Sequence, residues 1–200
     1  MKKLFILGIA LVICGSVAHA QNSKSFYKSS YESRNSGSWD QSASILSFGL
    51  GFPNVAPTYG GNSGFPPLYV KYEHGFLRDE IGLGGYVSTG FGETGNYYYF
   101  GGPSSGYQTN FFAFSIAILG YYHFNKLIPI EQMDVYAGAG LAFKNVAYDN
   151  EDIYDNDASV TVPVKVGIRY YVKPAFSFYA ESGWDGMSGL NLGVTLKLSK

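Results

Sequence analysis

From residue 43 onward, hydrophobic and polar positions alternate with a period of two along most of the chain. In the clearest segment, residues 160–172, valine, isoleucine and tyrosine occupy every even position, while the odd positions carry mainly polar residues and glycine. A period of two is typical of a β-strand whose two faces meet different surroundings. The same test predicts eight strands, near residues 43–52, 66–76, 80–91, 109–124, 133–144, 160–172, 175–184 and 188–198.

The connections between these predicted strands alternate in length. Long connections at residues 53–65, 92–108 and 145–159 alternate with short ones, and only the last hairpin, around residues 185–187, departs from this rhythm. Long loops at one end and short turns at the other are typical of outer-membrane barrels, in which a tilted strand needs about 9–11 residues to cross. The pattern therefore predicts an all-β, eight-stranded, antiparallel, transmembrane up-and-down barrel.

Charge and glycine indicate which face of the strands lies inside. Nine charged residues of the predicted strands share the face opposite the apolar one: Lys71, Glu73, Glu80, Asp134, Lys144, Lys165, Arg169, Glu181 and Lys197. Most strand glycines lie on the charged face too. Glycine weakens a solvent-exposed strand, but in a narrow lumen it leaves room for long side chains. We therefore expect a polar interior and an apolar face toward lipid.

Aromatic residues on the apolar face support this orientation. They lie toward the ends of the predicted strands, as in the interfacial girdles of membrane barrels: Phe48, Phe52, Tyr72, Phe76, Phe91, Phe124, Phe143, Tyr170 and Trp184. A soluble lipocalin-like barrel, with the apolar face inside, remains an alternative that cell fractionation would reveal.

Composition narrows the function classes. Charged residues make up 14% of the chain, against an average of about 25%, and the formal net charge is -1. This excludes a coiled coil and a basic nucleic-acid binder, and no phosphate-cradling loop is present. The high numbers of glycine (26) and tyrosine (18), together with the few charges, suggest β-structure in a solvent other than water.

The N-terminus is typical of a secretory signal peptide. Lys2 and Lys3 precede an apolar stretch at residues 4–13, and Ala18-His19-Ala20 supplies a small-residue cleavage site, which predicts a signal at residues 1–20. Cys14 suggests a lipoprotein, but Ile13 before it is not small. Cleavage would remove the one cysteine, which excludes disulfides and cysteine-based zinc sites. Polar residues 21–42 are predicted to form a mobile tail, and residues 43–200 the barrel domain.

The whole pattern resembles the small eight-stranded outer-membrane β-barrels of Gram-negative bacteria, of the OmpX, OmpW and OmpA-barrel type. The C-terminal segment carrying Asn191, Gly193, Leu196 and Leu198 is similar to that family's assembly signal, although leucine stands where aromatics are usual and two residues follow. The resemblance implies an outer-membrane location, contact with outer-membrane lipid and lipopolysaccharide, and recognition by the barrel-assembly machinery.

Inside the barrel we expect a polar network rather than an open channel, because eight strands enclose little more than their own side chains. The expected ionic members are Lys71, Glu73, Lys165, Arg169, Glu181 and Lys197. Tyrosines on the same face are expected to supply hydrogen bonds: Tyr69, Tyr86, Tyr136, Tyr171 and Tyr179. Arg169→Ala is expected to destabilise the chain more than Lys24→Ala.

Catalytic and metal chemistry find little support in the sequence. Beyond the signal the chain has only His74 and His123, and Ser115, on the inward face with His123, is roughly 26 Å from it along one strand. The acidic loop at residues 149–157 lacks the glycine of an EF-hand and is interpreted as solvated, with divalent-cation bridging to lipopolysaccharide as a hypothesis.

The sequence thus favours a structural or surface-interaction role, without enzymatic activity, cofactor or metal. The loop aromatics Tyr97, Tyr98, Tyr99 and Phe100 either extend the outer girdle or contact an extracellular ligand. Two alternatives remain: passage of small hydrophobic molecules, as the OmpW-type resemblance allows, and a lipid A-modifying enzyme.

Overall fold

A computed structural model describes residues 39–56, 61–97, 106–128, 130–149 and 155–198. Its strands form a single sheet: β1 (Ser44–Phe52), β2 (Gly61–Gly75), β3 (Ile81–Tyr97), β4 (Gly106–His123), β5 (Met133–Tyr148), β6 (Asp157–Thr161), β7 (Val164–Lys173), β8 (Phe176–Trp184) and β9 (Leu190–Lys197). Within the described ranges, no helix is both long and apolar enough to cross a membrane.

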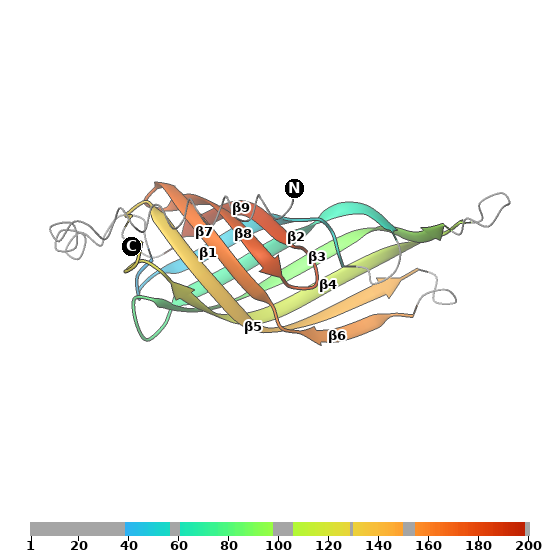
Figure 1. Cartoon of the computed structure of the whole chain (residues 1–200), viewed down its shortest axis with the longest axis horizontal. Helices are drawn as coiled ribbons and strands as arrows, with labels where there is room; N and C mark the ends of the chain where they lie inside the picture. The colour runs from blue at the N-terminus through green and yellow to red at the C-terminus, as the bar shows by residue number, and fades with distance from the viewer. Residues whose placement is uncertain (1–38, 57–60, 98–105, 129, 150–154, 199–200) are drawn as a thin grey trace.

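The sheet closes on itself as a meander (Figure 1). All pairings are antiparallel, and the first strand pairs with the last through Phe48 and Val194 at the centre of the β1–β9 ladder. β6 and β7 both pair with β5, one beyond the other, and so occupy one position in the wall. The predicted eight-stranded antiparallel barrel is therefore confirmed.

The predicted strand at residues 160–172 is interrupted, which corrects the sequence interpretation. β6 ends at Thr161 and β7 begins at Val164, because Pro163 between them has no amide hydrogen to donate to the ladder. The carbonyl of Pro163 still accepts a hydrogen bond from the Gly140 amide at 3.2 Å. The wall therefore continues across the break.

The predicted long connections are shorter than expected, because β2 to β5 continue into them. Alternation fades in these segments, yet cross-strand pairing persists, for example between Glu93 and Asn110. β3 and β4 have 17 and 18 residues, whereas β8 and β9 have 9 and 8. In Figure 1 the wall of β2 to β5 extends beyond the β8–β9 hairpin, and we call this end the loop end and the opposite one the turn end.

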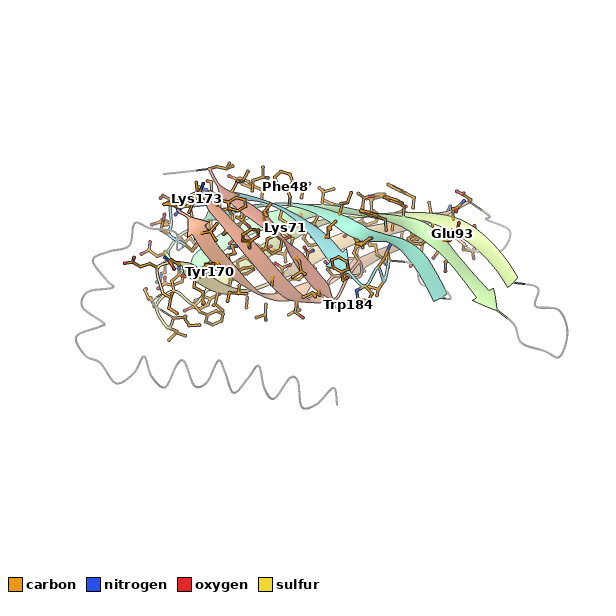
Figure 2. All side chains as sticks on the ribbon, turned by 90° about the horizontal axis from the view of Figure 1, so that it is seen from above. Phe48, Lys71, Glu93, Tyr170, Lys173 and Trp184 are labelled. Atoms are coloured by element: carbon orange, nitrogen blue, oxygen red, sulfur yellow. The ribbon has the colours of Figure 1, made fainter. Side chains whose placement is uncertain are left out.

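The two faces of the barrel are the ones that the sequence predicts. Of the nine strand charges, eight are buried inside and the ninth, Lys197, is half-buried. Large apolar residues point outward, with Ile118 68% and Val160 73% exposed. Phe48, Tyr170 and Trp184 lie on this outer surface (Figure 2). Phe48 and Phe91 lie inside β1 and β3 rather than near strand ends, so the girdle is less sharply confined than expected.

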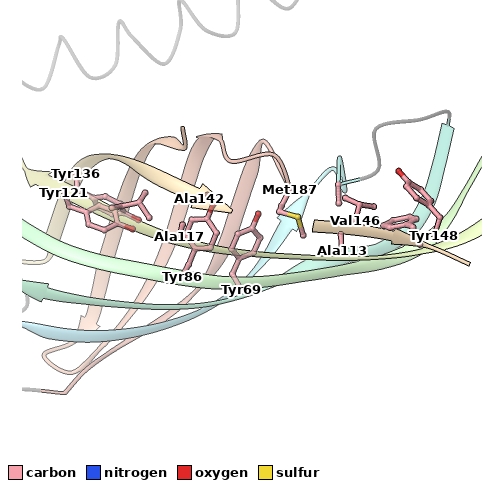
Figure 3. Packing of buried hydrophobic residues seen from close by; sticks show 13 residues of the cluster. Tyr69, Tyr86, Ala113, Ala117, Tyr121, Tyr136, Ala142, Val146, Tyr148 and Met187 are labelled. Atoms are coloured by element: carbon pink, nitrogen blue, oxygen red, sulfur yellow. The ribbon is translucent and has the colours of Figure 1, made fainter. Parts of the chain in front are cut away.

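Glycines in the lumen make room for tyrosines on the neighbouring strand. Tyr121 is paired with Gly138, Tyr136 with Gly167 and Tyr179 with Gly193. A Cβ atom on any of these glycines would lie under 3.0 Å from the partner ring. Figure 3 shows the buried tyrosines and small apolar residues along the interior, with Met187 between Tyr69 and Val146.

Candidate functional site

A cluster of four charged side chains crosses the lumen near the turn end. Arg169 on β7 donates to Glu73 Oε2 at 2.6 Å and to Asp134 Oδ2 at 2.7 Å. β7 and β2 are four positions apart in either direction around the eight-position wall. The Arg169–Glu73 ion pair therefore spans the diameter of the barrel.

His123 completes this turn-end cluster. Its Nδ1 lies 2.8 Å from Asp134 Oδ1 and its Nε2 lies 2.7 Å from Glu73 Oε1. Ionised carboxylates only accept hydrogen bonds, so both bonds form together when both ring nitrogens carry protons. The cluster then holds two positive and two negative charges and is balanced.

A second balanced cluster lies toward the loop end. Lys71 Nζ is 2.7 Å from Glu181 Oε1, and Lys165 Nζ is 3.3 Å from the same oxygen and 2.5 Å from Asp185 Oδ2. Tyr69 donates to that Asp185 oxygen at 2.8 Å. All four charged side chains are buried, so each charge is compensated by a neighbour rather than by bulk water.

Tyr136 connects the two clusters. Its hydroxyl donates to Glu181 Oε2 at 3.0 Å, and the Arg169 guanidinium carbon lies 3.9 Å from the centre of its ring. Tyr179 donates to Asn191 and has Lys71 Nζ 4.7 Å from its ring centre. The interior of the described barrel is therefore occupied by connected polar groups along much of its length.

Five of the six expected ionic residues belong to these clusters, and one does not. Lys197 instead contacts Asp40, before β1, at 3.0 Å. The sequence list lacked three members, His123, Asp134 and Asp185. His123 and Asp134 lie at the alternate strand positions that point inward, so the period of two could have identified them. Asp185 lies between β8 and β9, where alternation carries no information.

The loop end is covered by the β8–β9 connection. Asp185 Oδ1 accepts hydrogen bonds from the amides of Met187 and Ser188, both at 2.8 Å, which turns the chain inward. Met187 is fully buried, and its carbonyl accepts from the Val55 amide at 3.0 Å. Asp-Gly at residues 185–186 is a turn signal in the sequence, but it does not indicate that the turn folds into the lumen.

At the turn end, Trp39 is packed into the lumen, although it belongs to the predicted tail at residues 21–42, of which residues 21–38 lie outside the described ranges. Trp39 is only 3% exposed and stacks on His123, with ring centroids 4.0 Å apart. The polar composition of residues 21–42 concealed this contact. The one available signal was a large aromatic side chain close to the first strand.

The remaining expected residues are placed as follows. Asn191 is buried, whereas Leu196 and Leu198 are exposed on the outer face and Gly193 faces Tyr179. Tyr97 ends β3, and its side chain, with Tyr98, Tyr99 and Phe100, lies outside the described residues. Asp149 accepts a hydrogen bond from Asn110 at 2.8 Å, while residues 150–154 of the acidic loop are outside the description.

Histidine and carboxylate side chains do not form a metal site in the part of the chain that the structure describes, since no group of three or more is arranged to hold an ion. His74 points outward at the turn end, with its Nδ1 2.7 Å from Ser44 Oγ.

Comparison with known proteins places the fold. No family model and no curated protein matches the chain. The outer membrane protein OprG from Pseudomonas aeruginosa superposes with a TM-score of 0.52 at 9% identity, over 82% of this chain and 99% of that one.

Two further solved structures are similar. Neisserial surface protein A matches with a TM-score of 0.49 at 15% identity, over 78% of this chain and 96% of that one. The N-terminal β-barrel domain of Pseudomonas aeruginosa OprF matches with a TM-score of 0.42 at 19% identity, over 80% and 99%. At these identities the likeness concerns the fold alone. The superposition on OprG, together with the closed eight-position wall, gives the chain the fold of the small eight-stranded outer-membrane β-barrels.

Proposed function

We propose that this chain is an integral outer-membrane protein with a closed lumen and a structural or surface-interaction role, without enzymatic activity. The outer surface supports the membrane location. Its apolar band lies between Lys173 at the turn end and Glu93 at the loop end, both exposed (Figure 2). The exposed charges therefore lie at the ends of the band and not within it. A lysine or arginine at mid-membrane on the lipid face costs about 2–4 kcal/mol, which accounts for this distribution.

The orientation follows from the lengths of the hairpins, because β2 to β5 continue past the β8–β9 hairpin at the loop end. In outer-membrane barrels short turns face the periplasm and long loops face outward. The turn end, where β1 begins and β9 ends, is then periplasmic. A cleaved signal at residues 1–20 would supply the export that this location needs.

The closed lumen rests on one observation above all, the Arg169–Glu73 ion pair across the diameter of the barrel. An ion crossing the lumen would have to displace this pair. Removing one partner leaves the other charge buried and uncompensated, which is costly. A structural barrel is therefore better supported than a pore.

Planar lipid bilayers test the closed lumen. The refolded wild-type barrel should insert without discrete conductance steps, while an open porin in the same bilayer serves as the positive control. Reproducible steps from the wild-type chain, at a voltage that leaves an empty bilayer silent, would contradict the proposal.

The expected partners follow from the same location. Outer-membrane lipid and lipopolysaccharide would contact the apolar band and the loops, and the assembly machinery would recognise β9. Leu196 on β9 and Leu198 directly after it are exposed and available for such recognition. Calcium titration of the purified protein tests cation binding by the acidic loop, and absence of binding would remove cation bridging.

A second candidate, passage of small hydrophobic molecules, is favoured by the apolar loop end of the lumen. Phe111, Ala113, Val146 and Met187 are buried there, and the wall of β8 and β9 is shorter than that of β4 and β5. Proteoliposomes that take up an apolar fluorescent probe faster than empty liposomes would favour this candidate. The lipid-modifying alternative is less well supported, because both ring nitrogens of His123 already contact carboxylates and neither is free to act as a general base.

A further inference from the structure

We propose that the Trp39 segment (residues 39–42) is a removable plug that closes the turn end of the lumen and controls access of periplasmic solutes to the turn-end cluster. The inference rests on the proposed closed lumen and extends it, because it assigns the closure of one end to a separate piece of chain.

The plug covers the cluster directly. The Trp39 indole lies parallel to the His123 imidazole, at an interplanar angle of 2° and a centroid separation of 4.0 Å. The Arg169 guanidinium carbon is 6.0 Å from the same indole. Trp39, Ala43 and Ile45 form a small buried apolar cluster below the ion pairs. Solvent at the turn end therefore meets the indole before it reaches His123.

The barrel wall is shaped to receive this segment. Gly75 on β2 and Gly82 on β3 are cross-strand partners. A Cβ on Gly75 would collide with the backbone of Gln41, and one on Gly82 would lie 2.5 Å from Glu73 Oε1 and 3.0 Å from the Trp39 ring. The plug thus occupies the space left by Gly75, and it shares the space left by Gly82 with the turn-end cluster.

Side chains around the rim hold the plug in place. Lys197 at the end of β9 donates to Asp40 at 3.0 Å, and Asn125, after β4, donates to the Trp39 carbonyl at 2.8 Å. The Gln41 amide lies 3.4 Å from Asp79 Oδ1 in the β2–β3 turn. The strand ladder begins only at Ser44. The plug is therefore attached by a few polar contacts and by the packing of Trp39, and it can leave without opening any strand pair.

Tryptophan fluorescence tests the plug in the folded barrel. The chain has two tryptophans, and Trp184→Phe leaves Trp39 as the single reporter. In lipid vesicles, acrylamide should quench Trp39 several-fold less than in the urea-unfolded chain. Asp40→Ala combined with Asn125→Ala removes two anchors outside the strands and should raise quenching toward the unfolded value. Trp39→Phe, the complementary variant, leaves Trp184 as a control for lipid burial.

The outcomes separate the plug from the closed lumen. Equal quenching of Trp39 in the folded and unfolded chains, or no change on removing the anchors, would overturn the plug. Conductance steps from the wild-type barrel would instead overturn the closed lumen, whatever the quenching of Trp39. A boiling-dependent gel shift of each variant verifies that its barrel has folded.

Discussion

Arg169 holds the turn-end cluster together through two ion pairs and a ring contact. It contacts carboxylates from β2 and β5 and packs on the Tyr136 ring, while its own strand is β7. Its side chain therefore connects β7 and its neighbour β5 to β2 on the opposite side of the barrel. Loss of this one group leaves Glu73 and Asp134 with only His123 as a cationic partner.

We predict that Arg169→Ala lowers the free energy of unfolding by about 3–5 kcal/mol, as for other buried ion pairs from which one partner is removed. Lys173→Ala is the matched control, since Lys173 lies on the same strand but is exposed. Urea titration in detergent micelles, followed by fluorescence, gives both values. Equal midpoints for the two variants would count against a stabilising role for the turn-end cluster.

Asp40 makes attachment of the plug dependent on pH. Burial raises the pKa of Asp40, but hydrogen bonds from Ser42 and Lys197 outweigh burial and hold it below its usual value of 3.8. A carboxyl with a lowered pKa contributes stability that is present in full above about pH 5 and is lost as pH falls through its folded pKa.

Acrylamide quenching of Trp39 in the Trp184→Phe chain should therefore rise below about pH 4, as Asp40 takes up a proton. Asp40→Asn already lacks the charge, so its quenching should be higher at neutral pH and should change less on acidification. An identical pH profile for the two chains would show that the acid response does not come from Asp40 and would contradict the prediction.

For a single residue, the sequence predicts which face of the strand it occupies but not which partner it contacts. Alternation alone places Glu73 and Arg169 inside. The partner depends on barrel diameter and strand stagger, which bring the side chains of Glu73 and Arg169 together across the lumen and place Lys197 beside Asp40. Asp185 and Trp39 lie outside the alternating segments, so no periodic signal indicates their burial.

Between neighbouring strands, the recurring unit is a glycine beneath a tyrosine ring. In the Tyr136–Gly167 pair the ring lies across the bare glycine and still reaches Glu181 with its hydroxyl. Such pairs explain how an interior with so many tyrosines fits inside eight strands. They also explain why lumen glycine coincides with the charged face in the sequence.

We predict that Gly167→Ala destabilises the barrel by about 1–3 kcal/mol through overpacking against Tyr136. In a Tyr136→Ala background the same substitution should cost much less, because the ring is absent. Gly120→Ala is the control, since a Cβ there meets nothing within 4 Å. The test compares the loss of unfolding free energy caused by Gly167→Ala in the wild type, by Gly167→Ala in the Tyr136→Ala background, and by Gly120→Ala. A loss for Gly167→Ala that is the same with and without the Tyr136 ring would argue against the pairing.

Strand ends were less predictable than strand centres. β3 continues to Tyr97 through glycine and polar residues, where its pairing with β4 stabilises a segment whose local pattern favours a loop. Pro163 had the opposite effect and broke a segment with perfect alternation. In both cases backbone hydrogen bonding decided the outcome, and residue hydropathy is a poor guide to it.

Taken as one molecule, the barrel has a polar interior, an apolar exterior and a cover at each end. The sequence predicted the first two correctly, because period-two alternation defines both faces and the glycines indicate which one is enclosed. The covers are formed by Trp39 and by the Met187 turn, both from connecting segments. Their positions depend on the closed barrel and are not encoded by any repeat in the chain.

The central claim is that the apolar face meets lipid around a closed barrel. Gel mobility of the detergent-extracted outer-membrane fraction, loaded with and without boiling, tests it most directly. We predict that the chain is recovered in that fraction and migrates differently before and after boiling, because a closed transmembrane barrel resists detergent until heated. Recovery in the soluble periplasmic fraction, with the same mobility in both lanes, would contradict the account.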